Sequence, residues 1–257
     1  MPYSSRATLL AVGLATASLA LPCEQALAGT MALPSSGANS ASASSWLGGA
    51  HAGYNWQRGS GVFGFETDLQ ATHLNSAMSG GLVYPPVGTP SPGDFAMTSS
   101  TINWYGTARG RVGFASGPWL VYGTAGLAYG DVNLSSSFRA AGLQLTSQVS
   151  DTRLGWVAGL GAEYLVNPNL SVRLGYQYVD LGSLGLSASS PSPAVIVLGQ
   201  QATASARFQA VTAGFSWHFA PMGASMPWQG GYAGVHGGGA WGNNTSATYT
   251  STVINPP

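Results

Sequence analysis

Charge is scarce in this chain. Only 6% of its 257 residues are charged, lysine is absent, and the formal net charge is zero. A soluble domain carries about 25% charged residues, so this chain would make a poor water-facing surface. Nucleic-acid binding is not expected either, because the sequence has no basic patch that could meet a phosphate backbone.

Long apolar runs are also scarce, which excludes a helical membrane protein. The only such run covers residues 7–21 at the N-terminus, directly after Arg6. It is too short to span a membrane, and the small-residue sequence Ala-Leu-Ala follows it at residues 26–28. Residues 1–28 are therefore predicted to be a secretory signal peptide, so that the mature chain would begin at Gly29.

Metal ligands are few. The only cysteine, Cys23, lies in the predicted signal peptide, so the mature chain would contain no thiol and no disulfide. The four histidines are His51, His73, His218 and His236. No two of them have metal-binding spacing on one predicted element. We therefore expect no metal and no other cofactor.

Glycine and alternating apolar residues are abundant instead. Residues 155–182 show the pattern most clearly: apolar side chains occupy every second position on both sides of Asn167-Pro168-Asn169. A period of two indicates β-strands, and the Asn-Pro-Asn sequence is typical of a tight turn. This stretch is predicted to be an antiparallel hairpin with one apolar face and one face of small and charged residues.

The rest of the chain divides into similar segments. We predict a flexible lead-in at 29–44, seven strands within 45–219, a periplasmic linker at 220–227, a further strand at 228–242 and a disordered tail at 243–257. Long loops rich in Gly, Ser and Pro are predicted at residues 75–98, 135–147 and 183–200. Tight turns alternate with these loops, as they do in outer-membrane barrels.

Charged residues on the predicted strands share one register. They are Glu66, Asp68, Arg109, Arg111, Glu163 and Arg173, and all lie opposite the apolar face. In a barrel they would meet in the lumen and neutralise each other. The interior of an eight-stranded barrel is narrow enough for side chains to fill, so we expect a salt-bridged plug. The alternative is a selective path for ions.

Aromatic residues gather at the two ends of the predicted strands. Beside the tight turns lie Trp56, Phe114, Trp119, Tyr164, Trp217 and Phe219, and toward the long loops lie Trp46, Trp104, Tyr129, Trp156 and Tyr178. Two such girdles are typical of the two interfaces of a membrane barrel. The alternative is the aromatic core of a secreted β-sandwich, whose strands alternate too.

Several strand sequences resemble a known family. They are residues 52–57 (AGYNWQ), 105–113 (YGTARGRVG), 121–130 (VYGTAGLAYG) and 175–182 (GYQYVDLG). As a set they are similar to the porin-family, opacity-like surface proteins of Gram-negative bacteria, which are small OmpA-like eight-stranded barrels. The resemblance implies a location in the outer membrane, contact with its lipid and lipopolysaccharide, and recognition of Phe219 by the barrel-assembly machinery.

The chain departs from this family at its first strand. Members open with an aromatic, glycine-rich strand directly after the signal peptide, and this chain carries a similar stretch at residues 228–241 instead. We therefore predict an all-β, eight-stranded antiparallel transmembrane β-barrel whose first family strand has moved to the C-terminus. That strand would pair with residues 46–57 and 206–219. The alternative is that it begins a second barrel.

The expected function follows from the family resemblance. Its members are mostly structural proteins or surface antigens, so we expect a non-enzymatic surface protein whose long loops contact the host or other cells. One alternative is a small porin for ions or small solutes. A less favoured one is a lipid-A hydrolase, because some eight-stranded barrels have that activity. His73 lies near the predicted outer rim and the loops are rich in serine, but spacing alone assigns no catalytic residue.

Overall fold

The computed structural model describes residues 30–31, 43–83, 90–140, 143–189, 196–219 and 226–253. The predicted signal peptide lies outside these residues. The strands are β1 (Thr30–Met31), β2 (Ala43–Arg58), β3 (Gly61–Val83), β4 (Pro90–Ser116), β5 (Trp119–Ala140), β6 (Leu143–Asn167), β7 (Leu170–Ser189), β8 (Ile196–His218) and β9 (Gly230–Val253). Among the described residues, no helix is long and apolar enough to cross a membrane.

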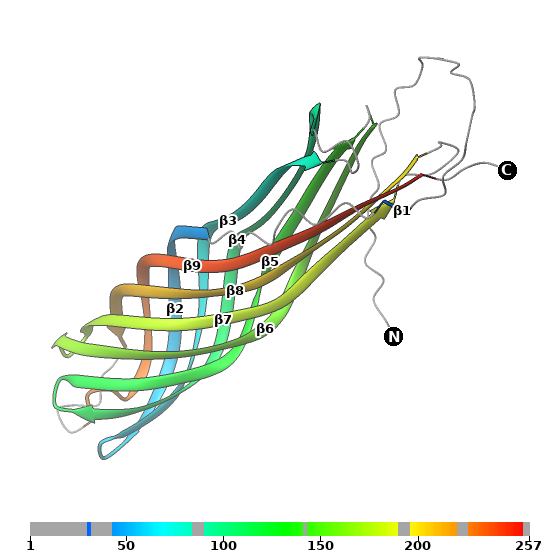
Figure 1. Ribbon diagram of the computed structural model, residues 1–257. Helices are drawn as coiled ribbons and strands as arrows, with labels where there is room; N and C mark the ends of the chain where they lie inside the picture. The colour runs from blue at the N-terminus through cyan, green and yellow to red at the C-terminus, as the bar shows by residue number, and fades with distance from the viewer. Residues whose placement is uncertain are drawn as a thin grey trace, which may run out of the picture.

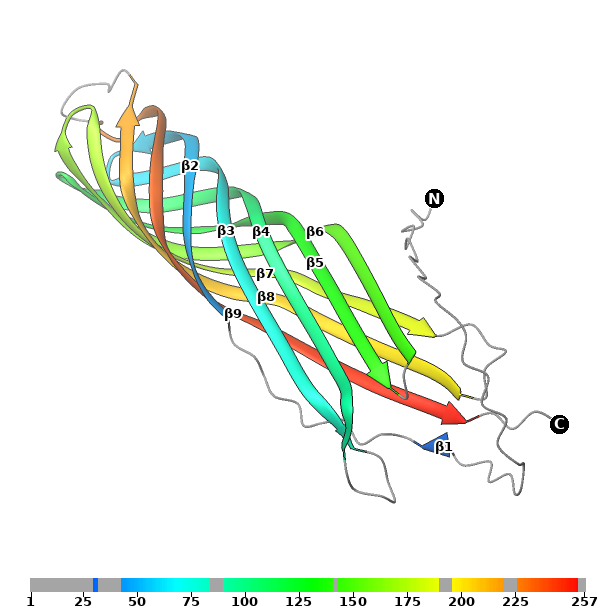
Figure 2. The same cartoon turned by 90° about the horizontal axis from the view of Figure 1, so that it is seen from above.

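The eight long strands form a closed ring (Figures 1 and 2). Each pairs antiparallel with its neighbour in sequence, and β9 pairs with both β8 and β2. Ala52 lies opposite Ala233, and Phe215 lies opposite Val235. The predicted pairing of the C-terminal strand is therefore confirmed, and β9 closes this barrel.

Tight turns join the strands at one end of the ring. Gly59 and Gly117 adopt φ values of 59° and 57° between β2 and β3 and between β4 and β5, a conformation that a side chain disfavours. Between β6 and β7, the backbone N–H of Asn169 donates to the Asn167 side chain at 2.9 Å. The turn at residues 167–169 is at its predicted position.

Side chains alternate across the barrel wall. The six aromatic residues predicted beside the tight turns are between 37% and 62% exposed, with Tyr164 the lowest and Phe114 the highest. Trp46 and Trp156, toward the other end, are also exposed. Apolar side chains cover the outer face between these two levels, while charged side chains lie inside. This arrangement suits lipid outside and a filled interior.

The prediction of long loops at residues 75–98, 135–147 and 183–200 is wrong, because most of these residues belong to strands. β3 continues to Val83 and β4 begins at Pro90, so most of residues 75–98 is paired strand. Likewise β5 ends at Ala140 and β6 begins at Leu143, and residues 183–189 and 196–200 belong to β7 and β8. Serine, threonine and glycine indicated loops by composition. In this outer half of the barrel, however, the alternation continues with apolar residues inside: Val132 and Leu134 of β5 are buried, while Asn133 and Ser135 between and after them are partly exposed.

The predicted segment boundaries also need correction. β2 begins at Ala43, and Thr30–Met31 forms a short strand on β9, so the lead-in of residues 29–44 is partly ordered. β9 begins at Gly230 rather than at 228 and continues to Val253, so the predicted disordered tail is wrong for residues 243–253. Their threonine-rich sequence favours a strand, and β8 pairs with them throughout residues 244–253.

Candidate functional site: the charged interior of the barrel

The structure brings all six predicted charged residues together in the lumen, with Glu66 at the centre. Arg109 Nη2 lies 2.6 Å from Glu66 Oε1 and 2.6 Å from Asp68 Oδ2. From the opposite wall, Arg173 reaches the same Glu66 carboxylate at 2.9 and 3.0 Å through its two terminal nitrogens. One carboxylate of β3 therefore joins strands β4 and β7 across the barrel.

Arg111 extends the cluster to β6. Its Nη2 donates to Glu163 Oε1 at 2.7 Å, and its Nη1 lies 3.6 Å from Glu66 Oε2. Arg173 Nε is 3.9 Å from Glu163. Three arginines and three acids thus form one continuous neutral network. Because the arginine fork binds carboxylates in a fixed plane, such a network also fixes the positions of the strands that carry it.

Two tyrosines complete this network, and the sequence did not single them out. The Arg111 guanidinium stacks on the Tyr122 ring at 3.6 Å from its centroid. A glycine at position 161 makes room for that ring, since a Cβ there would lie 2.3 Å from it. Tyr232 on β9 accepts from Arg111 at 3.0 Å and donates to Glu66 at 2.9 Å. The closing strand therefore contributes directly to the charged cluster.

An uncharged network lies on the outer side of the cluster. Tyr105 donates to Gln70 at 2.9 Å and accepts from Gln177 at 2.7 Å. Gln70 and Thr107 both donate to Asp68, at 2.9 and 2.7 Å. Gln70 binds Asp68 Oδ1, which Arg109 leaves free, and Thr107 shares Asp68 Oδ2 with Arg109. Along their strands, these residues occupy the same alternate positions as the predicted lumen charges. This alternation is the sequence signal that would have placed them inside.

Apolar layers enclose the charged cluster on both sides. At the tight-turn end, Val62, Ala115, Leu120, Tyr122 and Trp228 pack together. The fully buried Trp228 belongs to the connection before β9, where its backbone N–H donates to the Gln57 side-chain oxygen at 3.0 Å. Toward the outer half lies a larger apolar cluster that includes Leu47, Leu74, Ile102, Leu134, Leu181 and Phe208. The barrel is therefore filled along its length.

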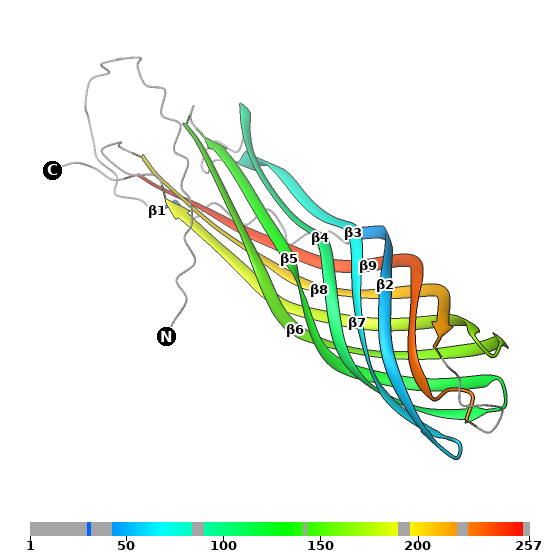
Figure 3. The same ribbon diagram turned by 180° about the vertical axis from the view of Figure 1, so that it is seen from behind.

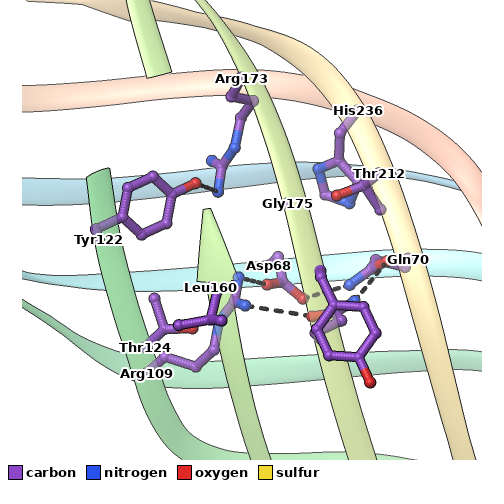
Figure 4. Close-up of a pocket in the computed structure, with 12 residues that line it drawn as sticks. Asp68, Gln70, Arg109, Tyr122, Thr124, Leu160, Arg173, Gly175, Thr212 and His236 are labelled. Carbon is purple, nitrogen blue, oxygen red and sulfur yellow. Dashed lines mark hydrogen bonds and ion pairs between the residues drawn. The ribbon is translucent and has the colours of Figure 1, made fainter. Parts of the chain in front are cut away.

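A small cavity remains beside the cluster (Figure 4). Its volume is about 20 Å³, and Asp68, Arg109, Thr124, Arg173 and Gln177 are among the residues that line it. That volume is close to the minimum that accommodates one water molecule. It is too small for a continuous path of waters or hydrated ions.

Three of the four histidines lie inside the barrel. His51 Nδ1 is 3.2 Å from His236 Nδ1, and His51 Nε2 is 2.9 Å from the Ser216 hydroxyl. His218 lies 3.0 Å from Ser171. The fourth, His73, is on the outer face of β3. Within the described residues, no three His, Cys, Asp or Glu side chains could hold a metal ion.

Phe219, the predicted assembly signal, follows β8 at the tight-turn end. Its side chain is 54% exposed, and its backbone N–H donates to Gly231 O at 2.8 Å. Phe219 directly follows the seventh long strand, β8, and its backbone is hydrogen-bonded to β9. Its recognition by the assembly machinery stays a prediction.

Comparisons with known proteins agree with this architecture. The outer membrane protein beta-barrel domain family matches residues 7–219. The 31 kDa outer-membrane immunogenic protein of Brucella melitensis biotype 1 is 36% identical over 153 residues, covering 59% of this chain and 60% of that protein. The 22 kDa outer membrane protein of Rhizobium leguminosarum bv. viciae is 37% identical over 140 residues, covering 54% of each chain.

The 25 kDa outer-membrane immunogenic protein of Brucella abortus biovar 1 is 28% identical over 138 residues, covering 54% of this chain and 53% of that protein. This chain therefore matches little more than half of the length of these relatives. The family match, in contrast, extends over most of the chain and agrees with the closed antiparallel ring. The chain belongs to the outer membrane protein beta-barrel domain family and is an outer-membrane β-barrel protein.

Proposed function

We propose that this protein is a closed, non-conducting and non-enzymatic barrel that acts as a structural or surface-exposed component of the outer membrane. The filled lumen carries the proposal: a neutral network of six charged side chains lies between two apolar layers. Opening a path would separate buried ion pairs, and removing one partner of such a pair costs about 3–5 kcal/mol. The barrel interior therefore favours a fixed plug over an ion path.

Conductance in planar lipid bilayers tests this proposal. The heat-modifiable, folded protein should give no steady unit openings, while a general diffusion porin inserted by the same procedure should give them. Steady openings of one size from the wild-type protein would support the small-porin alternative instead. The porin control shows that the procedure detects a channel when one is present.

Hydrolysis of lipid A has less support from the geometry. The Ser216–His51 and Ser171–His218 pairs are buried inside the lumen, away from the lipid-facing surface. His73 faces outward, where its backbone N–H donates to the Ser45 hydroxyl at 3.2 Å. A shift in the mass of lipid A on co-expression, absent for the His73→Ala variant, would overturn the non-enzymatic part of the proposal.

We further propose where this barrel meets its surroundings. The apolar band between the two aromatic girdles would contact outer-membrane lipid and lipopolysaccharide. The exposed Phe219 would be recognised by the barrel-assembly machinery at the periplasmic end. The outer half, whose paired strands extend beyond that band, would contact the host or other cells. Two of the relatives are named immunogenic proteins, which fits such exposure.

A further inference from the structure

The barrel wall is divided in its outer half. β6 and β7 are paired from Asn167 opposite Leu170 as far as Trp156 opposite Asp180, and the described residues beyond that point are not paired with each other. From there, residues 143–155 of β6 pair with β5 alone, and residues 183–189 of β7 pair with β8 alone. Figures 1 and 3 show β5 and β6 diverging from β7, β8 and β9. We call this opening the β6–β7 seam.

Local backbone geometry explains where the seam begins. β7 has a register shift between Asp180 and Ser183, and Gly182 between them adopts a φ of 80°. On β6, Arg153 forms an ion pair with Asp151 at 3.3 Å and donates to the backbone carbonyl of Ser183 across the seam. A bulge of this kind ends strand pairing and redirects the chain. The separation is thus encoded in β7.

Apart from Asp151 and Arg153 where the seam begins, both edges of the seam lack the features that usually block an added strand. Natural edge strands are protected by charged side chains or proline. Residues 143–150 of β6, Leu-Gln-Leu-Thr-Ser-Gln-Val-Ser, contain neither, and nor do residues 183–189 of β7. An uncharged edge with alternating apolar and polar residues is complementary to an uncharged extended peptide.

The chain already adds one strand to this outer half. β1 pairs antiparallel with the outer part of β9, with Thr30 opposite Thr252 and Met31 opposite Ser251. β9 pairs there with β8 on its other side. Strand addition to an outer edge of this barrel is therefore a feature of the structure itself.

We propose that the outer edge of β6, at residues 143–150, binds an extended, uncharged polypeptide segment of an extracellular partner by antiparallel β-strand addition. In this mode main-chain hydrogen bonds provide the affinity, and alternate side chains provide the specificity. A second copy in the same membrane does not supply its own β6, because that strand would run parallel to this one. The site is independent of whether the lumen conducts.

Amide hydrogen exchange of the full-length protein in detergent micelles gives the first test. Residues 143–150 are paired on one side only, so alternate amides should point into the seam and exchange fast. The remaining amides of the segment should be protected by β5. Uniform protection in the protein alone would overturn the proposal, because the edge would then already be covered, for example by another copy.

Binding of a synthetic peptide gives the second test. The probe is a fluorescently labelled octapeptide with the uncharged sequence of residues 143–150, which can approach the edge antiparallel. Fluorescence anisotropy should show saturable binding to the folded barrel and protection of the fast-exchanging amides. The same peptide carrying two prolines should not bind, because proline removes the donors that strand pairing needs. Absence of saturable binding at millimolar peptide would overturn the proposal.

Matched variants locate the site. Gln148→Lys places a charge on the exposed face of the β6 edge and should weaken peptide binding by about tenfold. Ser99→Lys is the control, because Ser99 lies on β4 and is paired on both sides, opposite Ala77 and Ser135. If Gln148→Lys does not fold, Thr146→Lys replaces it. Equal affinity in a folded edge variant and in the control would sink the assignment.

Discussion

At the scale of single residues, the lumen depends on one carboxylate. Glu66 contacts all three arginines of the cluster and accepts from Tyr232, and its side chain is fully buried. A buried charge is tolerated only when its partners satisfy it. Glu66 of β3 therefore stabilises contacts with β4, β7 and β9 at the same time. Loss of its charge would weaken all of these contacts.

Replacement of that carboxylate tests its importance. Glu66→Gln keeps the shape of the side chain but leaves the buried arginines with one negative charge fewer. The free energy of unfolding measured in urea should therefore fall by about 3–5 kcal/mol. Asp151→Asn is the matched control: its ion pair with Arg153 is about one-third exposed on both sides and should contribute only about 0–1 kcal/mol. Equal unfolding free energies for the two variants would contradict a stabilising role of the cluster.

The sequence could predict the charged residues but not their aromatic partners. Alternation alone fixes the side of the wall to which a strand residue points, and this was sufficient to bring six charges into one lumen. Tyr105 and Tyr122 share the register of inward residues, yet tyrosine is equally typical of the lipid interface. Which inward residues contact each other depends on how far neighbouring strands are shifted relative to one another around the ring. The periodicity of a single strand does not contain this shift.

At the scale of elements, the strands are longer than a membrane requires. A transmembrane strand needs about 9–11 residues, whereas β4 has 27 and β6 has 25. The sequence predicted the membrane part well because lipid demands an apolar outer face there. It failed beyond the outer girdle, where serine, threonine and glycine become frequent and many outward positions are polar, although the strands stay paired.

Amide hydrogen exchange at Ser135 tests whether this part of the chain is a paired strand or a loop. This residue lies in the predicted loop of residues 135–147, but it stands on β5 between Ser99 of β4 and Gln148 of β6. Its amide should therefore exchange at a rate typical of a central strand, far slower than an exposed loop. Exchange within seconds, with the membrane part of β5 still protected, would show that the outer ladder does not form in solution.

At the scale of the whole molecule, ring closure comes from the C-terminal part of the chain. β2 runs toward the tight turns and β9 runs away from them, so β1 and the end of β9 both lie at the outer end of the barrel. This placement follows from the predicted pairing, because a strand that follows β8 can close the ring only in the outward direction. β9 also delivers Tyr232 to the charged cluster and follows directly on the buried Trp228.

Two truncations test the closure. Removal of residues 220–257 deletes β9 and exposes the edges of β2 and β8, and unpaired backbone groups are not tolerated in hydrocarbon. We expect this variant to lose the compact, heat-modifiable band on a gel and to become sensitive to protease. Removal of residues 243–257 alone keeps the pairing of β9 with β2, which ends at Ala43 opposite Gly242, and should preserve that band. A protease-resistant, heat-modifiable barrel from the longer truncation would mean that seven strands close without β9, which would contradict its role as the closing strand.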